Sequence, residues 1–136
     1  MMMPRVTAFY AALLALLMLV LAARVVFYRR RARIGIGDGG DKALALRVRV
    51  HANFAENIPL ALVLLLVLEL LATVPLWLHV FGIGLVLGRV LHAVGLSRTA
   101  GTSNGRVLGT VLTWLAIAAM ALVLLWQSVA WWLLTA

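Results

Sequence analysis

The stretch Arg49–Val74, RVHANFAENIPLALVLLLVLELLATV, decides the fold class of this chain. From Ile58 onward it is apolar except for Glu69 and Thr73, and a helix of about 20 such residues crosses the ~30 Å hydrocarbon core of a membrane. Its first part places polar groups, Glu56 among them, where that helix enters the hydrocarbon. Ionisable side chains at such a depth are rare without a partner or a function. The stretch therefore predicts a membrane helix with a functional site at one end.

The whole chain has the composition of a membrane protein. Of its 136 residues 65% are hydrophobic and only 12% are charged, with a mean hydropathy of +1.12, far from the values of a soluble domain. Four apolar segments are long enough to span, at residues 6–28, 52–73, 76–96 and 107–126. We predict an all-α integral membrane protein in which residues 1–136 form one bundle of four transmembrane helices.

Basic residues predict the orientation of that bundle. The net charge is +8, and much of it lies in the link of residues 29–50, beginning with Arg29, Arg30 and Arg31. By the positive-inside rule this link is cytoplasmic, and both termini are then outside, in the periplasm of a bacterial inner membrane. The basic residues lie beside membrane spans rather than on a separate surface, which favours contact with anionic lipid headgroups over nucleic acid.

Glycine and proline mark the connections. Gly35, Gly37, Gly39 and Gly40 predict a turn inside the first link, and a short uncharged turn is expected near Pro75. The GxxxG spacings of Gly84 with Gly88 and of Gly105 with Gly109 favour close helix packing in lipid.

The absence of cysteine excludes disulfides, thiolate metal sites and a cysteine nucleophile. Any thiol chemistry must therefore use a thiol that the substrate brings. A metal site built from His51, His92 and Glu56 is not expected, because His51 does not share the face of the other polar residues on the second span.

Polar side chains converge on one layer of the predicted membrane. At ~100° per residue, Arg49, Asn53 and Glu56 lie within ~60° of one another on the second span. Arg89 and His92 share a face of the third span, which runs back to the same side. In contrast, the acid and histidine nearer the outer face of the bundle are expected to be solvated at the membrane surface; these are Glu69 and His79.

The chemistry of this layer suits an anionic thiol. Guanidinium groups bind carboxylates in a two-pronged geometry, Glu56 can bind an amine, and a nearby arginine such as Arg106, which opens the fourth span, can favour thiolate over thiol. A tripeptide thiol with two carboxylates and one amine fits, although charge pattern alone does not single it out. The other interpretation is that the arginines extend to the lipid headgroups and neutralise Glu56.

The run RVHANFAENIP at residues 49–59, with GRVLH at residues 88–92, resembles the MAPEG family, the membrane-associated proteins of eicosanoid and glutathione metabolism. The resemblance covers nearly the whole chain and is strongest to small bacterial members. It implies a homotrimer of four-helix protomers, with glutathione bound as co-substrate between neighbouring protomers near the cytoplasmic side. The residues that it implies for glutathione binding are Arg30, Arg49, Asn53, Glu56, Arg89 and His92, and Arg106 is implied as the catalytic residue that activates the thiol.

Two departures from the family pattern bear on function. Asn57 and Leu96 stand where several relatives have tyrosines whose hydroxyls hold glutathione. The leading hypothesis is a glutathione-dependent transferase or peroxidase that acts on a lipophilic electrophile. The alternative is a non-catalytic lipid-binding or scaffold member of the family. A small multidrug transporter is disfavoured, since residues 6–23 lack the acidic residue which that class carries in its first span.

Overall fold

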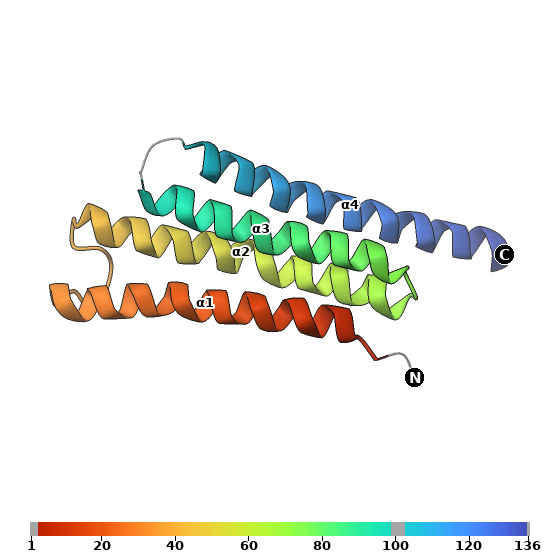
Figure 1. Ribbon diagram of the computed structural model, residues 1–136, viewed down its shortest axis with the longest axis horizontal. Helices are drawn as coiled ribbons and strands as arrows, with labels where there is room; N and C mark the ends of the chain where they lie inside the picture. The colour runs from red at the N-terminus through yellow and green to blue at the C-terminus, as the bar shows by residue number, and fades with distance from the viewer. Residues whose placement is uncertain (1–2, 99–102, 136) are drawn as a thin grey trace.

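The computed structural model describes residues 3–98 and 103–135, which form four long helices (Figure 1). Their bounds are α1 Arg5–Ala32, α2 Lys42–Leu70, α3 Pro75–Arg98 and α4 Asn104–Thr135. Each helix is long and apolar enough to cross a membrane. The predicted all-α class with four spans is confirmed.

The central pair of helices is α2 and α3, and the other two pack on opposite sides of it (Figure 1). Within the described ranges, α1 contacts α2 and α3, α4 contacts the same two helices, and α1 and α4 do not touch each other. The polar residues that the sequence places on α2 and α3 therefore lie in the middle of the bundle or on the edges of this central pair.

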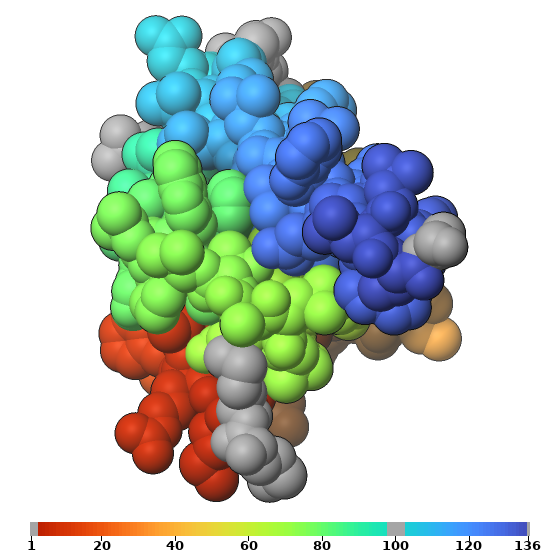
Figure 2. Space-filling view, turned by 90° about the vertical axis from the view of Figure 1, so that its right-hand side faces the viewer, coloured from red at the N-terminus to blue at the C-terminus, as the bar shows by residue number. Residues whose placement is uncertain are grey.

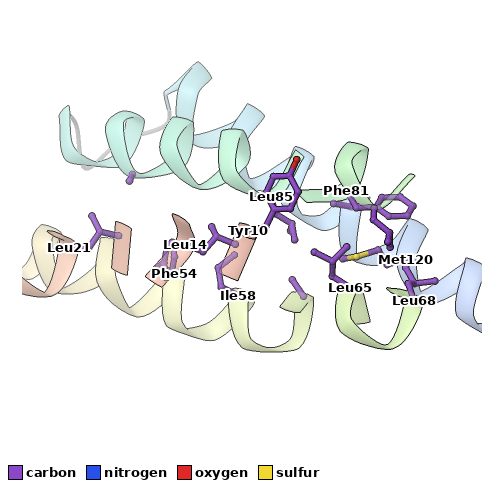
Figure 3. Close-up of a cluster of buried hydrophobic side chains, with 14 of the residues drawn as sticks. Tyr10, Leu14, Leu21, Phe54, Ile58, Leu65, Leu68, Phe81, Leu85 and Met120 are labelled. Carbon is purple, nitrogen blue, oxygen red and sulfur yellow. The ribbon is translucent and has the colours of Figure 1, made fainter. Parts of the chain in front are cut away.

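The core draws apolar side chains from all four helices (Figure 3). Leu14, Phe54, Leu65, Leu85 and Met120 are almost completely buried. Many other large apolar side chains face outward, as in helices whose surroundings are lipid rather than water. The residues that face the core and those that face lipid are thus similarly hydrophobic. For this reason, sequence periodicity alone did not reveal the core face.

The first link is shorter than predicted, because residues 29–32 and 42–50 are helical. Arg33 ends α1 in the left-handed conformation with φ 55°, and the Asp41 side chain begins α2 by accepting from the amides of Ala43 and Leu44 at 2.8 and 3.0 Å. The Leu44 amide and the Tyr28 hydroxyl donate to this carboxylate, which lowers the pKa of Asp41. Most of the basic residues beside the link thus lie within α1 and α2, and Arg33 lies just after α1.

The structure describes all of the connection between α2 and α3 but only part of the connection between α3 and α4. The short turn predicted near Pro75 spans residues 71–74, and α3 begins at Pro75, one residue before the predicted start of the third span. The connection between α3 and α4 lies partly outside the described residues.

Glycine brings α3 and α4 close together. A Cβ atom on Gly109 would lie 2.5 Å from the carbonyl oxygen of Gly88 and would also meet the backbone of His92. At Gly84, by contrast, a Cβ would make only an ordinary contact of 3.9 Å. Of the predicted small-residue positions, Gly88 and Gly109 meet backbone to backbone, Gly105 lies against the α3 backbone at Leu91 and Gly95, and Gly84 makes no close approach.

Candidate functional site

An exposed ion pair lies on the first half of α2. Nη1 of Arg49 is 3.1 Å from Oε1 of Glu56, and the two side chains are 59% and 51% exposed. Seven residues are two helical turns, so both side chains leave the helix on one face. Arg49 also lines a hollow of about 280 Å³ beside the first link, with Arg29 and Asp38. The pair is thus open to a ligand or to another protein surface.

Asn53 diverges from this pair and turns toward α3. Its Oδ1 accepts a hydrogen bond from Nη1 of Arg89 at 2.7 Å. The predicted single polar stripe is therefore divided in the protomer. Arg49 and Glu56 face outward, whereas Asn53 belongs to a buried network.

Arg89 is the centre of that buried network, with a side chain that is only 2% exposed. Its Nε donates to the Thr113 hydroxyl at 3.0 Å, and its Nη2 lies 3.5 Å from the carbonyl oxygen of Gly109. Within residues 3–98 and 103–135, no carboxylate lies at ion-pair distance from this guanidinium. Neutral oxygens from α2 and α4 thus hold Arg89, and Arg89 ties α2, α3 and α4 together.

The acceptors on α4 were missed by the sequence analysis. Thr113 is fully buried, and its hydroxyl also donates to the carbonyl oxygen of Gly109 at 2.8 Å. Threonine is ordinary in membrane helices, and nothing in its spacing pointed to Arg89. The one available signal was Gly109, because a glycine that lets two backbones approach also exposes its carbonyl to the facing helix.

The remaining predicted site residues are His92, Arg106 and Arg30, and they lie at the same end of the bundle as Arg49. The His92 side chain is 4% exposed and lies on α3 three residues after Arg89. Arg106 is half-buried on the first turn of α4, where its amide donates to the Ser103 hydroxyl. Arg30 is exposed near the end of α1. Arg49, Arg89 and Arg106 thus lie at one end of the bundle, and Arg89 and His92 are buried inside it.

Asn57 and Leu96, the two departures from the family pattern, are both occupied in packing. The Asn57 amide donates to the carbonyl oxygen of Asn53 at 2.8 Å and accepts from the indole of Trp114 at 3.3 Å. Leu96 is 3% exposed. The contact to Trp114 links α2 to α4 beside Glu56, and no sequence pattern had indicated it.

The prediction that Glu69 is solvated is wrong. Its side chain is 7% exposed, and its two carboxylate oxygens accept from the amides of Val6 and Thr7 at 2.8 and 2.7 Å. The first amides of a helix have no partner inside the helix and favour a negative charge, so Glu69 caps α1. His79 is exposed as predicted, but Nδ1 of its ring hydrogen-bonds to the buried Tyr10 hydroxyl at 3.0 Å.

Metal binding has no support among the described residues. No group of three histidine, aspartate or glutamate side chains lies close enough there to hold an ion. His51 is half-buried on α2.

Comparison with known proteins assigns this chain to a family. The model of the MAPEG family matches residues 7–126. The chain belongs to the MAPEG family. The inner membrane protein YecN of Escherichia coli K12 is 37% identical over 121 residues, which are 89% of this chain and 91% of YecN. The YecN protein of Escherichia coli O6:H1 gives the same values.

Membership in the MAPEG family, the four apolar helices and the similarity to an inner membrane protein together identify an integral protein of the bacterial inner membrane. The family match covers α2, α3 and their polar residues completely. It begins two residues after the start of α1 and ends at Trp126, before the last turns of α4.

Proposed function

We propose that this MAPEG protein is a glutathione-dependent membrane transferase or peroxidase that acts on lipophilic electrophiles. The proposal rests on family membership together with one structural observation, the exposed Arg49–Glu56 pair. Glutathione would bind at the cytoplasmic end, between protomers of a homotrimer, with both termini in the periplasm.

The exposed pair fits the γ-glutamyl end of glutathione, where an ammonium group and a carboxylate share one carbon. The Arg49 guanidinium can hold a carboxylate through two parallel hydrogen bonds, and Glu56 can hold the ammonium group. The two groups are 3.1 Å apart and about half exposed in the protomer, so a zwitterionic ligand can replace their contact with its own at little cost. Exposed charges at membrane depth also favour burial against a neighbouring protomer, which is the reason for placing the site there.

Arg106 is the residue proposed to act on the thiol. Glutathione must lose a proton to become a nucleophile, and a partly desolvated guanidinium favours the thiolate. The thiol proton leaves to solvent, and sulfur forms a bond to an electrophilic carbon that arrives from the bilayer. In a substitution the bond from that carbon to its leaving group breaks and the leaving group departs with the electron pair; in an addition to an activated double bond the π electron pair takes up a proton from solvent. In the peroxidase reaction, two glutathione molecules are oxidised to the disulfide while a hydroperoxide is reduced to an alcohol and water.

A difference absorbance titration tests ligand and activating residue together. Glutathione is added at neutral pH to purified wild-type protein and to Arg106→Ala, and absorbance is followed in the thiolate band. We expect a saturable thiolate signal in wild type that is lost in Arg106→Ala, while calorimetry still detects glutathione binding by the variant.

Arg47→Ala is the matched control for that titration. It removes the same charge from the cytoplasmic end, but the Arg47 side chain stacks on Tyr28 and donates to the carbonyl oxygen of Ala43, away from Glu56. We expect its signal to equal that of wild type. Absence of saturable glutathione binding to the wild-type protein at millimolar concentration would rule out the proposal.

A second candidate function is a non-catalytic lipid-binding or scaffold role. The observation that favours it concerns Asn57 and Leu96, which have no hydroxyl to offer glutathione. The Asn57 side chain is already hydrogen-bonded to Asn53 and Trp114, and Leu96 is buried. Retention of lipid through purification, with no turnover over a broad panel of electrophiles, would support this role.

A further inference from the structure

The two ends of the bundle differ in charge. Figure 2 faces one end, where the α2–α3 turn (green) lies beside the last part of α4 (dark blue), and neither segment contains a basic residue. The other end, where α1 finishes, carries a cluster of arginines at residues 29–33 (Figure 1). A hollow of about 400 Å³ lies there. Its lining residues are Val26, Arg29, Arg30, Arg33, Ile34 and Gly35.

The lining of this hollow changes from apolar to basic along one face of α1. Val26 is followed by arginines three, four and seven residues later, a spacing that places all four side chains on one side of a helix. Val26 belongs to the apolar part of α1, and Arg33 is its C-cap, about 10 Å further along the helix axis. Deeper in the membrane the same face continues with Leu19, which is 65% exposed. A ligand that matches this face is anionic at the membrane surface and apolar below it.

The arginines of the hollow have no carboxylate to neutralise them within the protomer. In residues 3–98 and 103–135 the contact of Arg49 with Glu56 is the one ion pair. The two acids of the first link are engaged with backbone amides, since Asp38 accepts from an amide inside the link and Asp41 caps α2. The hollow therefore keeps its positive charge for a ligand.

The wall of the hollow is held in place by the chain itself. The Ile34 amide donates to the carbonyl oxygen of Arg29 at 3.1 Å. In return Nη1 of Arg29 donates to the carbonyl oxygens of Gly35 and Gly37 at 3.3 and 2.7 Å. These bonds fix the start of the link against the end of α1, so the hollow is formed before a ligand arrives.

We propose that this hollow binds one anionic phospholipid of the cytoplasmic leaflet, of the chemistry of phosphatidylglycerol. The Arg33 guanidinium bonds to the phosphate, for which its planar donors are well suited, and the other arginines of the lining add positive charge. One acyl chain follows Val26 and Leu19 toward the bilayer centre. A free phosphate ion would leave the apolar part of the face uncovered, and a zwitterionic phospholipid gains less from the charge.

Photolabelling in nanodiscs tests the proposal. Wild-type protein is placed in phosphatidylcholine with a trace of phosphatidylglycerol that carries a diazirine at the start of one acyl chain. Phosphatidylcholine is then replaced stepwise by unlabelled phosphatidylglycerol with the same chains, and the fall in labelling gives the preference for the anionic lipid. We expect labels on residues 19–26. Arg33→Gln should lower the preference by about fivefold, the effect of one basic residue near an anionic headgroup.

Arg31→Gln is the matched control. It removes the same charge from the same end, but Arg31 lies about 140° around the helix from Val26 and lines a separate hollow with Tyr28 and Ala32. It should keep the wild-type preference. An equal loss in Arg31→Gln and Arg33→Gln would overturn the proposal, because the lipid would then be attracted by the basic end as a whole.

Three results with the wild-type protein alone would also overturn the proposal. They are labelling that does not fall as phosphatidylglycerol replaces phosphatidylcholine, labels confined to helices other than α1, and displacement of the probe by millimolar inorganic phosphate. Arg30 is left unchanged in these experiments, because it belongs to the proposed glutathione site. Glutathione titration of the same samples therefore reports on that site independently, and the lipid site does not depend on it.

Discussion

At the scale of single residues, the two glutamates of α2 show how depth and neighbours decide what a carboxylate does. Glu56 is half exposed and pairs with Arg49, whereas Glu69 is buried and accepts two amides of α1. Sequence gives the position of each along the helix. It does not give the neighbour, because Glu69 meets Val6 only through the packing of α1 on α2. The positions of both acids could therefore be predicted from the sequence, whereas the solvation predicted for Glu69 was wrong.

Glu69→Gln is predicted to destabilise the protein. One of the two α1 amides then faces an NH₂ group instead of an oxygen, and an unsatisfied buried donor costs about 2 kcal/mol. The free energy of unfolding, measured by SDS titration in mixed micelles, should fall by that amount. The amide hydrogens of Val6 and Thr7 should also exchange faster, because their acceptor is changed.

Glu56→Gln is the control on the same helix. Its carboxylate is half exposed, and pairs of that kind contribute about 0.5 kcal/mol or less. Equal stability of Glu69→Gln and wild type, with unchanged exchange at Val6 and Thr7, would contradict the capping role of Glu69.

At the scale of helices, α3 and α4 meet along a line of small residues that also carries the buried arginine. Gly109 serves both purposes, since it lets the backbones approach and offers its carbonyl to Arg89. The close approach brings Thr113 near enough to accept from Arg89 at 3.0 Å. The packing of α3 on α4 therefore positions the network that fixes Asn53 next to Glu56.

Gly109→Ala is predicted to weaken this packing. The added methyl group would meet the carbonyl oxygen of Gly88 at 2.5 Å and the backbone of His92, and backbone atoms cannot move aside as a side chain can. Overpacking of this kind costs about 1–3 kcal/mol. The expected result is a lower free energy of unfolding, again measured by SDS titration.

Gly84→Ala supplies the comparison, since its methyl group would make an ordinary contact of 3.9 Å. Alanine also favours a helix over glycine by up to about 1 kcal/mol, so this variant should be as stable as wild type or more so. If both variants lost stability equally, the close approach at Gly109 would not be the cause.

Helix number, membrane insertion and the clustering of polar groups at one end could all be predicted from the sequence, because hydropathy and spacing act along a single helix. The partners of Arg89 could not, since Thr113 and Gly109 reach it across a helix interface. The extent of α1 and α2 was underestimated for a different reason. Basic residues such as Arg29 and Arg47 mark the edge of the hydrocarbon, but they do not end a helix.

At the scale of the whole molecule, the protomer has charged groups on its surface that a membrane does not readily accommodate. Arg49 and Glu56 are about half exposed on α2, and Arg30 is exposed near the end of α1. Assembly into the homotrimer that we propose would place the α1 end of one protomer beside the α2 pair of the next. A site built in this way contains residues from two chains, and mixed assemblies can test it.

Complementation between variants is therefore predicted. Arg30→Ala and Arg49→Ala should each lose the thiolate signal of bound glutathione. When the two variants are co-expressed, random mixing gives about a quarter of the interfaces an intact Arg30 from one protomer and an intact Arg49 from its neighbour. About a quarter of the wild-type signal should return, with native mass spectrometry reporting three chains. Mixing separately purified and stably assembled variants should restore nothing. Failure of the co-expressed sample to recover any signal would place both arginines in one protomer's site and remove the argument for a site between protomers.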